Sequence, residues 1–342
     1  MLHKWILPIA VLSLAPAAVA VDVPESRLKM FRPLPPAAES QKNPITPEKI
    51  ELGRMLYYET RLSKSHKFSC NSCHKLDQYG VDNEPTSEGH KGQRGDRNSP
   101  TVYNAALHFA QFWDGRAADV EEQAKGPILN PVEMAMPHEK VVIATLKSMP
   151  EYVAMFRKAF PQDRNPVTYE NMAKAIGAFE RRLMTPSRWD RFLQGDKAAL
   201  NDAEKAGFLK FVDTGCATCH MGVCVGGAMY QKLGLVEPYP GLKDEGRAKV
   251  TRREEDRYFF KVPGLRNVEK TWPYFHDGSV KTLDEAVRLM ARYELGKDLS
   301  PADVTSIVTW LKTLTGEIPA DFIRPPKLPP STARTPKPTE SD

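Results

Sequence analysis

The stretch Cys70-Asn71-Ser72-Cys73-His74 decides how the rest of the sequence is interpreted, and its pattern returns as Cys216-Ala217-Thr218-Cys219-His220. Cys-x-x-Cys-His is the attachment pattern of a c-type haem. In each stretch the two thiols would add across the haem vinyl groups, and the histidine would become the proximal iron ligand. Because the two stretches use four of the five cysteines, the sequence predicts two covalently bound haems.

Other uses of paired cysteines fit the spacing poorly. In a zinc ribbon the two pairs usually stand about 15–20 residues apart, whereas Cys73 and Cys216 are separated by most of a domain. A thioredoxin-like pair would need a βαβ context, which is not visible around either stretch. The fifth cysteine, Cys224, is interpreted as a small buried hydrophobe or free thiol.

The first twenty residues have the features of a secretory leader. Lys4 provides a positive start, an apolar run follows from Ile6 to Val19, and Ala18-Val19-Ala20 is a small-residue cleavage site. The apolar run is too short to span a bilayer, and no later run is long enough. We therefore expect cleavage after Ala20, no membrane span, and a periplasmic location, since haem c and an oxidising compartment occur together there.

The formal net charge of the 342-residue chain is +5 at pH 7. This mildly basic balance lacks the strong basic stripe of a nucleic-acid-binding protein, so no nucleic-acid partner is expected. The chain that remains after removal of the predicted leader is long enough for two domains of ordinary size. Each of them would contain one haem motif.

The break Met184-Thr185-Pro186-Ser187 divides the chain. We expect a signal peptide (1–20), a first haem domain (21–185), a second haem domain (186–317) and a Pro-rich C-terminal tail (318–342). The tail would be disordered or would partly fold back on the first domain. The predicted fold class is all-α with long loops, in two cytochrome c-like domains with one c-type haem each.

Helix signals support this class. Thr46-Pro47-Glu48 combines an N-cap, a proline at the first helical position and an acid, and it predicts a helix through Tyr58. Similar caps stand at Thr282-x-x-Glu285 and Ser300-Pro301-x-Asp303. The second of these opens a helix with the apolar stripe Val304, Ile307, Val308, Leu311 and Leu314. Further helices are expected over residues 138–160, 166–184 and about 202–212.

Each haem needs a second axial ligand, and the identity of that ligand determines the chemistry. For the first haem, the long loop 76–104 contains His90, which is either a distal ligand that can withdraw or a solvated loop residue. His66, His108 and His138 are further histidines available to that haem. For the second haem, Met290 on the helix after Thr282 is either the distal ligand or a core methionine. Spacing alone separates neither pair of alternatives.

The ordered motifs of the chain resemble those of the bacterial dihaem cytochrome c peroxidases over nearly the whole mature sequence. The motifs that carry the resemblance are Gly53-Arg54-x-Leu56-Tyr57, Ser69 to His74, Pro85-Thr86-Ser87-x-Gly89-His90, Arg97 to Thr101, Phe112 to Ala117, Gln123 to Pro127, Val132-Glu133-Met134, Cys216 to His220, Phe260 to Pro263 and Pro273 to Ser279.

The resemblance implies an enzyme, a cytochrome c peroxidase that reduces hydrogen peroxide to water. His74 would be the proximal ligand of the peroxidatic haem, and His90 the distal ligand that blocks it in the oxidised resting state. His220 and Met290 would hold the iron of the electron-accepting haem. A Met/His haem has a high potential and a bis-His haem a lower one, which agrees with these roles.

The resemblance also assigns the groups around the two haems. Glu133 would be the catalytic acid/base, with Gln123 beside it. O–O cleavage needs a proton to be moved from the iron-bound oxygen to the leaving oxygen, which a carboxylate within hydrogen-bond reach can do. Trp113 would relay electrons between the haems; without the family it would be interpreted as a large core residue. His276 is either a hydrogen-bond donor to a haem propionate or a core residue.

A calcium ion and protein partners follow from the same resemblance. Asn98 and the backbone carbonyls of Thr271 and Pro273 would bind calcium at the domain interface, since such oxygen ligands suit that ion. A small cytochrome c or a cupredoxin would donate electrons near the second haem. Reduction of that haem would gate the release of His90. A homodimer is expected.

Two other functions remain as alternatives. A MauG-type dihaem enzyme would oxidise a protein substrate, and such relatives carry tyrosine as the distal ligand of the second haem; Tyr293 lies close to Met290 in sequence. A non-catalytic dihaem electron carrier would have no use for Gln123 and Glu133, and both of its haems would stay six-coordinate.

Overall fold

The computed structural model describes residues 21–339. The predicted leader and its cleavage site after Ala20 lie outside this range. Across the described range, no helix is both long enough and apolar enough to cross a membrane.

Short and medium helices provide most of the regular structure. The α-helices are α1 (Glu25–Leu28), α2 (Pro47–Tyr57), α3 (Cys70–Cys73), α4 (Val120–Leu129), α5 (Glu139–Lys147), α6 (Pro150–Ala159), α7 (Tyr169–Glu180), α8 (Arg188–Leu193), α9 (Asp202–Thr214), α10 (Ala248–Thr251), α11 (Leu283–Leu295) and α12 (Pro301–Leu311). Two strands, β1 (Tyr230–Lys232) and β2 (Phe259–Lys261), pair antiparallel with Tyr230 opposite Lys261.

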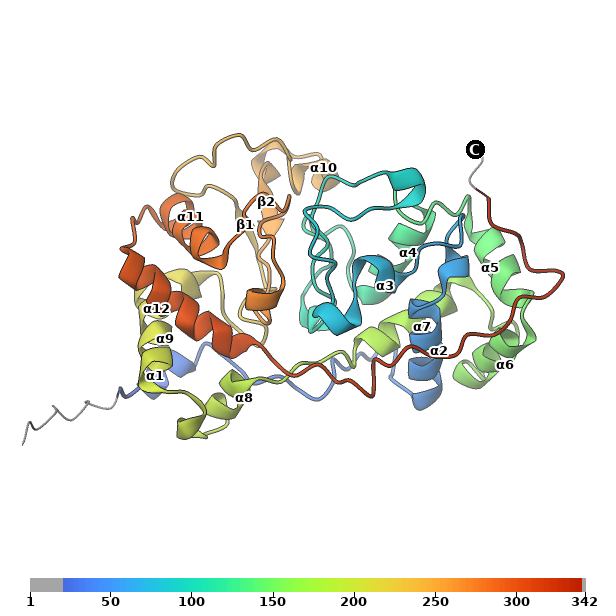
Figure 1. The fold of residues 1–342 in the computed structure, drawn as a ribbon, viewed down its shortest axis with the longest axis horizontal. Coiled ribbons are helices and arrows are strands. Elements are labelled where there is room, and N and C mark those ends of the chain that lie inside the picture. The colour runs from blue at the N-terminus through green and yellow to red at the C-terminus, as the bar shows by residue number, and fades with distance from the viewer. Residues whose placement is uncertain (1–20, 340–342) are drawn as a thin grey trace, which may run out of the picture.

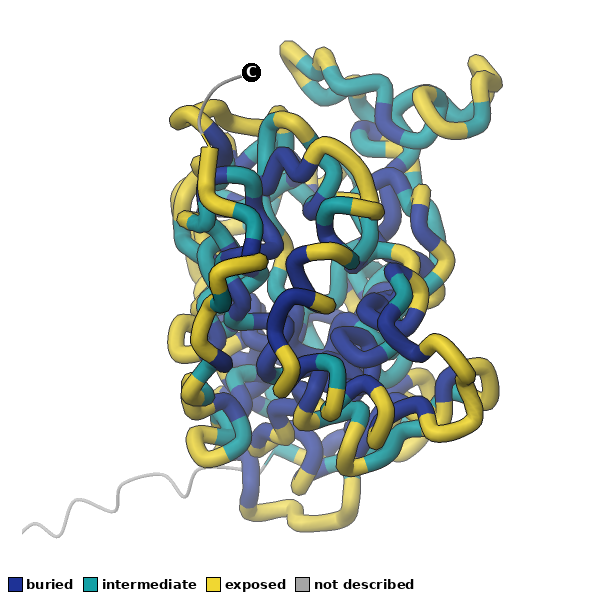
Figure 2. The backbone as a smooth tube through the Cα atoms, turned by 90° about the vertical axis from the view of Figure 1, so that its right-hand side faces the viewer, coloured by how far each residue is buried: buried dark blue, intermediate teal, exposed yellow. Residues whose placement is uncertain are grey.

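The helices form two groups that lie side by side (Figure 1). The first lobe contains α2 to α7, and the second lobe contains α8, α9, α11, α12 and the short β1–β2 pair. Figure 2 shows that the buried stretches of backbone run through the interior, while turns and connecting loops are exposed. The predicted all-α class with long loops is confirmed.

The core of the first lobe forms where α2 crosses α7. The helix α2 begins at the predicted cap, since the Thr46 side chain accepts a hydrogen bond from the Lys49 N–H at 3.3 Å. Gly53 allows a close crossing, because a Cβ atom there would collide with the carbonyl group of Ala175 in α7. Apolar side chains from both helices are fully buried around this point: Leu52, Leu56, Met172, Ile176 and Phe179.

Gly53→Ala is therefore expected to destabilise the protein. The added methyl group forces α2 away from α7 and costs about 1–3 kcal/mol of unfolding free energy, which exceeds the roughly 1 kcal/mol gained in helix propensity. Gly126→Ala in α4 is the control, because its Cβ would lie 3.5 Å from Phe112, an ordinary contact. Thermal unfolding followed by circular dichroism should show a lower Tm for Gly53→Ala alone. Equal Tm values for the two variants would contradict the tight crossing.

The second lobe repeats this arrangement with α9 and α12. Gly207 in α9 faces the carbonyl group of Ser306 in α12, where a Cβ atom would collide. Trp189 lies between Phe208 and Trp310, with ring centroids 4.9 and 5.3 Å apart. The predicted apolar stripe of α12 is buried, as expected, at Val304, Ile307, Val308, Leu311 and Leu314.

Proline positions explain where the observed helices differ from the predicted ones. The predicted helix over 138–160 is two helices, α5 and α6, that separate before Pro150, since proline has no N–H and disfavours helical geometry in the residue before it. The helix α4 was not predicted, and it contains Pro127. The caps at Thr282 and Ser300 are present.

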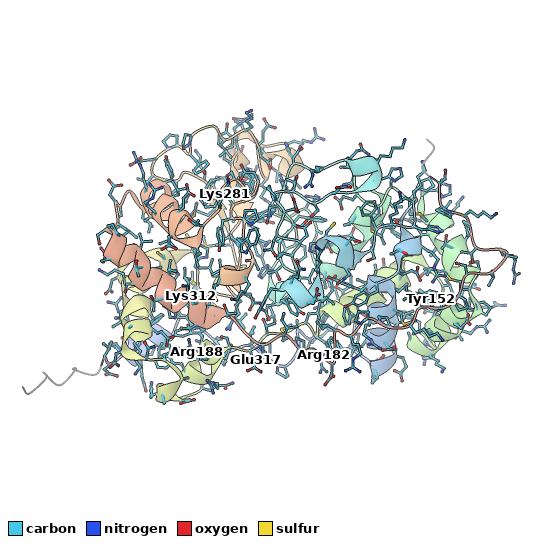
Figure 3. The ribbon with its side chains drawn as sticks, viewed as in Figure 1. Tyr152, Arg182, Arg188, Lys281, Lys312 and Glu317 are labelled. Carbon is cyan, nitrogen blue, oxygen red and sulfur yellow. The ribbon has the colours of Figure 1, made fainter. Side chains whose placement is uncertain are left out.

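Both ends of the described chain bridge the lobes. Near the N-terminus, Val23 and Phe31 pack in the core of the second lobe. After α12 the Pro-rich tail runs along the first lobe, where Ile323 is buried and Phe322 stacks on Phe179 at 5.1 Å. Figure 1 shows these blue and red segments crossing between the lobes, and Figure 3 labels Glu317, just before the tail, in this crossing region.

Candidate active site

The second Cys-x-x-Cys-His motif follows α9 directly. Gly215 ends α9 with a positive φ of 107° and starts the turn that carries Cys216. Burial lowers the pKa of His220 to about 4, so the imidazole is neutral. Its Nδ1 atom lies 3.3 Å from the carbonyl oxygen of Val225. A neutral ring oriented by a carbonyl through one nitrogen can ligate iron through the other.

The same motif lines a cavity, and residues of α11 and α12 line that cavity as well. Cys216, Cys219 and His220 share this cavity with Met290, which lies far along the chain on helix α11. The rest of the wall near Met290 is mainly apolar, with Leu283, Ala286, Val287, Ile307 and Leu311. We call this space the second-lobe cavity. It brings the two predicted iron ligands, His220 and Met290, to one space.

The first motif is placed by α3, which carries both cysteines. A reciprocal capping box between Ser69 and Ser72 opens this single turn. His74 ends it, and its carbonyl oxygen accepts a hydrogen bond from the Tyr57 hydroxyl at 2.8 Å. Burial lowers the pKa of His74. The imidazole is therefore neutral, as an iron ligand must be.

The His90 segment is attached to the loop that carries Glu133. The His90 N–H donates to the carbonyl oxygen of Glu133 at 2.8 Å. Gly89 is in close contact with Val132 and Glu133, so that a Cβ atom at residue 89 would collide with them. The Gln93 side chain bonds the carbonyl oxygens of His90 and of the neighbouring loop. Two stretches far apart in sequence therefore form one structural unit.

Glu133 lies on a second cavity, formed mainly by α4 and the loop that follows it. Its Oε1 atom accepts a hydrogen bond from the Asn130 side chain at 2.6 Å. Burial raises the pKa of Glu133, while the Asn130 bond and the positive charge of Arg116 oppose this shift. Burial raises the pKa of the Cys73 thiol, and the charges of Asp82 and Glu133 add to this shift, so Glu133 lies near the first haem motif. Gln123 lies on α4 but is not among the residues that line this cavity, and its role stays a prediction.

Phe112 and Trp113 connect the two cavities. Phe112 lines both of them, and Trp113 lines the second-lobe cavity. The Trp113 Nε1–H donates to the carbonyl oxygen of Asn98 at 2.9 Å, and its own carbonyl oxygen accepts from the Lys261 N–H at 2.7 Å. The indole is thus held by a carbonyl of the first lobe, while the Trp113 backbone is bonded to the second lobe. A core residue and an electron relay are both possible uses of this position.

The predicted calcium ligands lie along the second-lobe cavity, and their role stays a prediction. Asn98, Thr271 and Pro273 all line the second-lobe cavity. The Asn98 backbone N–H donates to the carbonyl oxygen of His276 at 2.7 Å. The Asn98 side-chain amide donates to the backbone carbonyl oxygen of Glu84 at 3.0 Å. A backbone hydrogen bond therefore links Asn98 of the first lobe to the second-lobe loop that carries Thr271, Pro273 and His276.

The donor groups fit covalent haem better than a bare metal ion. Within residues 21–339, no group of three or more His, Cys, Asp or Glu side chains could hold an ion. Each motif instead offers two thiols, neither of them in a disulfide, and one neutral imidazole. This is the set of groups that haem c uses.

Comparison with known proteins agrees with this donor set. The family model described as di-haem cytochrome c peroxidase matches residues 47–198. The chain is 46% identical to the cytochrome c551 peroxidase of Pseudomonas aeruginosa, over 99% of this chain and all of the relative. It is 50% identical to the cytochrome c551 peroxidase of Nitrosomonas europaea, over 86% and 88% of the two chains.

The chain belongs to the di-haem cytochrome c peroxidase family. As a member of this family it is a haem-containing oxidoreductase with two c-type haems. Its fold is also similar to the crystal structure of a MauG-like protein associated with microbial copper homeostasis, with a TM-score of 0.75 and 27% identity over 90% of this chain and 99% of that one.

Met290 and Tyr293 lie differently with respect to the second-lobe cavity. Met290 lines the second-lobe cavity, whereas Tyr293 is not among its lining residues. The Tyr293 ring instead packs edge-on against Tyr239 at 5.1 Å. A tyrosine ligand at this site would therefore require α11 to rotate.

Three residues of the site were missed or misplaced by sequence reasoning. Asn130 is bonded to Glu133, and its place two residues before Val132 offered no signal. His108 was considered for the first haem, but it lies in the second-lobe cavity with its Nδ1 atom 3.2 Å from the Lys261 Nζ. Lys261 was noted only as part of the motif Phe260 to Pro263.

Proposed function

We propose that this protein reduces hydrogen peroxide to water in the periplasm, with electrons from a small cytochrome c or a cupredoxin. The observation that carries the proposal is the backbone hydrogen bond between His90 and Glu133. It links the backbone of a histidine of the first haem site to the backbone of Glu133, whose carboxyl group has a pKa raised by burial. An electron carrier would need no such pairing.

The haem-holding residues divide between the two lobes. Cys70, Cys73 and His74 would hold the first haem, with His90 as its releasable ligand. Cys216, Cys219, His220 and Met290 would hold the second. When bound, the haems supply the iron at which peroxide is reduced and the centre that receives the donor's electrons.

Glu133 would move the proton that O–O cleavage requires. As a carboxylate it takes the proton from the oxygen that approaches the first haem site, and as a carboxylic acid it gives the proton to the leaving oxygen. One peroxide, two electrons and two protons give two water molecules. Asn130 orients the carboxyl group for both steps.

Trp113 would couple the two haem sites, because the Phe112–Trp113 pair extends from the Glu133 cavity to the second-lobe cavity. His90 would leave the first haem site when the second is reduced, together with the loop around Gly89. Calcium bound by Asn98, Thr271 and Pro273 would tie this loop to the second lobe. A homodimer is part of the proposal on the strength of the family resemblance.

The test of this function is the peroxide-dependent oxidation of a reduced small cytochrome c by the purified holoprotein. We expect two donor molecules to be oxidised for each peroxide consumed, as the electron balance requires. Loss of peroxide without donor oxidation, or no loss at all, would rule the proposed function out.

Asn130→Ala should change the pH dependence of the reaction. The Asn130 bond stabilises the carboxylate form of Glu133, so its loss raises the Glu133 pKa further. As the pH falls, the Glu133 carboxylate is then protonated at a higher pH than in the wild type. The acid limb of the kcat/KM profile is therefore expected to move up by about one pH unit. Gln93→Ala is the control, since Gln93 bonds backbone carbonyls and not the carboxylate. An unchanged acid limb in Asn130→Ala would show that another group sets it.

A further inference from the structure

Lys261 is a buried lysine that forms no ion pair with a carboxylate of residues 21–339. The residue ends β2 and is 6% exposed. Burial lowers its pKa to about 8, and the thiol of Cys224 is the group of the described chain that opposes this shift. Burying an ammonium group without an anionic partner is costly. A lysine in this situation indicates an anion that binds next to it.

His108 orients the ammonium group without neutralising it. Its Nδ1 atom lies 3.2 Å from the Lys261 Nζ, and burial with the lysine charge lowers the pKa of His108 well below its usual value. The neutral imidazole therefore accepts one of the three ammonium hydrogens. Hydrogens remain for a further acceptor.

The position of His108 is fixed by the opposite lobe. A Cβ atom on Gly264 would lie 2.8 Å from the His108 Nε2 atom, and one on Gly227 would collide with the ring. The imidazole of a first-lobe residue is thus clamped between two glycines near the second-lobe cavity. The Lys261 N–H is also bonded to the Trp113 carbonyl oxygen, so the lysine backbone is fixed as well.

Lys261 and His108 both line the second-lobe cavity, which also holds Cys216, His220 and Met290. A haem attached there brings two propionate carboxylates. We propose that Lys261, oriented by His108, is the counter-ion of a propionate of the second haem. The inference rests on the second haem site of the proposed function.

The proposal has a consequence for the electron-accepting site. A fixed positive charge stabilises the reduced haem, which carries one more electron, and therefore raises its reduction potential. Because His108 belongs to the first lobe and Lys261 to the second, the ion pair would also lock the lobe interface beside Trp113. Lys261 is a positioning and potential-setting residue, not a catalytic one.

The test compares Lys261→Met with Lys281→Met in the holoprotein. Lys281 is an exposed lysine of the second lobe, labelled near α11 in Figure 3, so both variants lose one positive charge. We expect Lys261→Met to lower the reduction equilibrium constant of the second haem about tenfold, or about 59 mV for one electron. Lys261→Arg keeps the charge and should stay within about threefold of wild type. Redox titration followed by visible absorption measures all three variants.

Two results would overturn the proposal. One is a reduction potential of the second haem that is the same in Lys261→Met as in Lys281→Met. The other is a potential shift in Lys261→Arg as large as the shift in Lys261→Met. Haem content, measured as the pyridine complex, separates these results from a failure of the haem assignment, because a wild-type protein with one haem contradicts the proposed function itself.

A wild-type measurement decides the matter if Lys261→Met does not take up its haem. The groups that face Lys261 are His108, whose pKa is far below the usual value, and Cys224, whose pKa burial raises to about 12. Neither titrates near pH 8. An ion-paired Lys261 keeps its charge there, so the potential of the second haem should be flat around that pH. A fall centred near pH 8 would show an unpaired lysine and would overturn the proposal.

Discussion

Glu133→Gln is expected to lower kcat/KM for hydrogen peroxide by about 100- to 10,000-fold, the usual contribution of a general acid/base. Glutamine has nearly the same size and can still interact with Asn130, but it cannot accept and return a proton. Because Glu133 is not a haem-attaching residue, both haems and their optical spectra should be unchanged. Stopped-flow mixing of the activated enzyme with peroxide measures the loss.

Glu139→Gln is the matched control for this variant. Glu139 lines the rim of the same cavity and is exposed, so its removal changes the local charge without touching the proposed proton path. Its kcat/KM should stay within about threefold of wild type. If Glu133→Gln also retained wild-type turnover, the acid/base role would have to be assigned elsewhere.

His90→Ala is expected to make the fully oxidised enzyme active. In the wild type the His90 imidazole would close the first haem site until the second haem is reduced. If the open form is about 1% of the oxidised wild type, the variant should turn over peroxide up to ~100-fold faster in that state. The backbone bond to Glu133 remains in the variant, so the carboxyl group stays in place.

His138→Ala is the control, since His138 is exposed and only precedes α5. Its oxidised form should stay as inactive as the wild type. Peroxide consumption by the oxidised proteins, with the spin state recorded by electron paramagnetic resonance, gives the comparison. An inactive, low-spin His90→Ala protein would mean that another group blocks the first haem site.

The parts of the fold that were predictable depend on local chemistry. The caps at Thr46, Thr282 and Ser300 satisfy free N–H groups of the first helical turn with a side chain a few residues away, so sequence alone reveals them. The two haem motifs are equally local. The apolar stripe of α12 was predictable because its period matches that of a helix.

The parts that were not predictable depend on contacts between distant residues. The three-residue strands β1 and β2 are too short to show a period. The packing of Val23 and Phe31 in the second lobe, although they precede the first-lobe helices, leaves no local mark. The His108–Lys261 contact joins residues of different lobes. It became visible only when burial and distance could be measured.

The residues of the candidate site also divide into those that local sequence indicates and those that only the folded chain brings together. The resemblance suggested Glu133 and His90 separately, while their backbone bond is a property of the folded chain. Met290 was open between ligand and core from spacing alone; it lines the same cavity as His220, and its role as an iron ligand remains a prediction. The roles of Gln123 and of the calcium ligands remain predictions.

The central claim is that reduction of the second haem opens the first. The most direct test is to record the spin state and peroxide turnover of the purified holoprotein, fully oxidised and after addition of one electron per monomer. We predict that only the half-reduced form shows a high-spin haem and consumes peroxide. Equal activity of both forms would contradict the gating by His90, and two low-spin, inactive forms would make the protein an electron carrier.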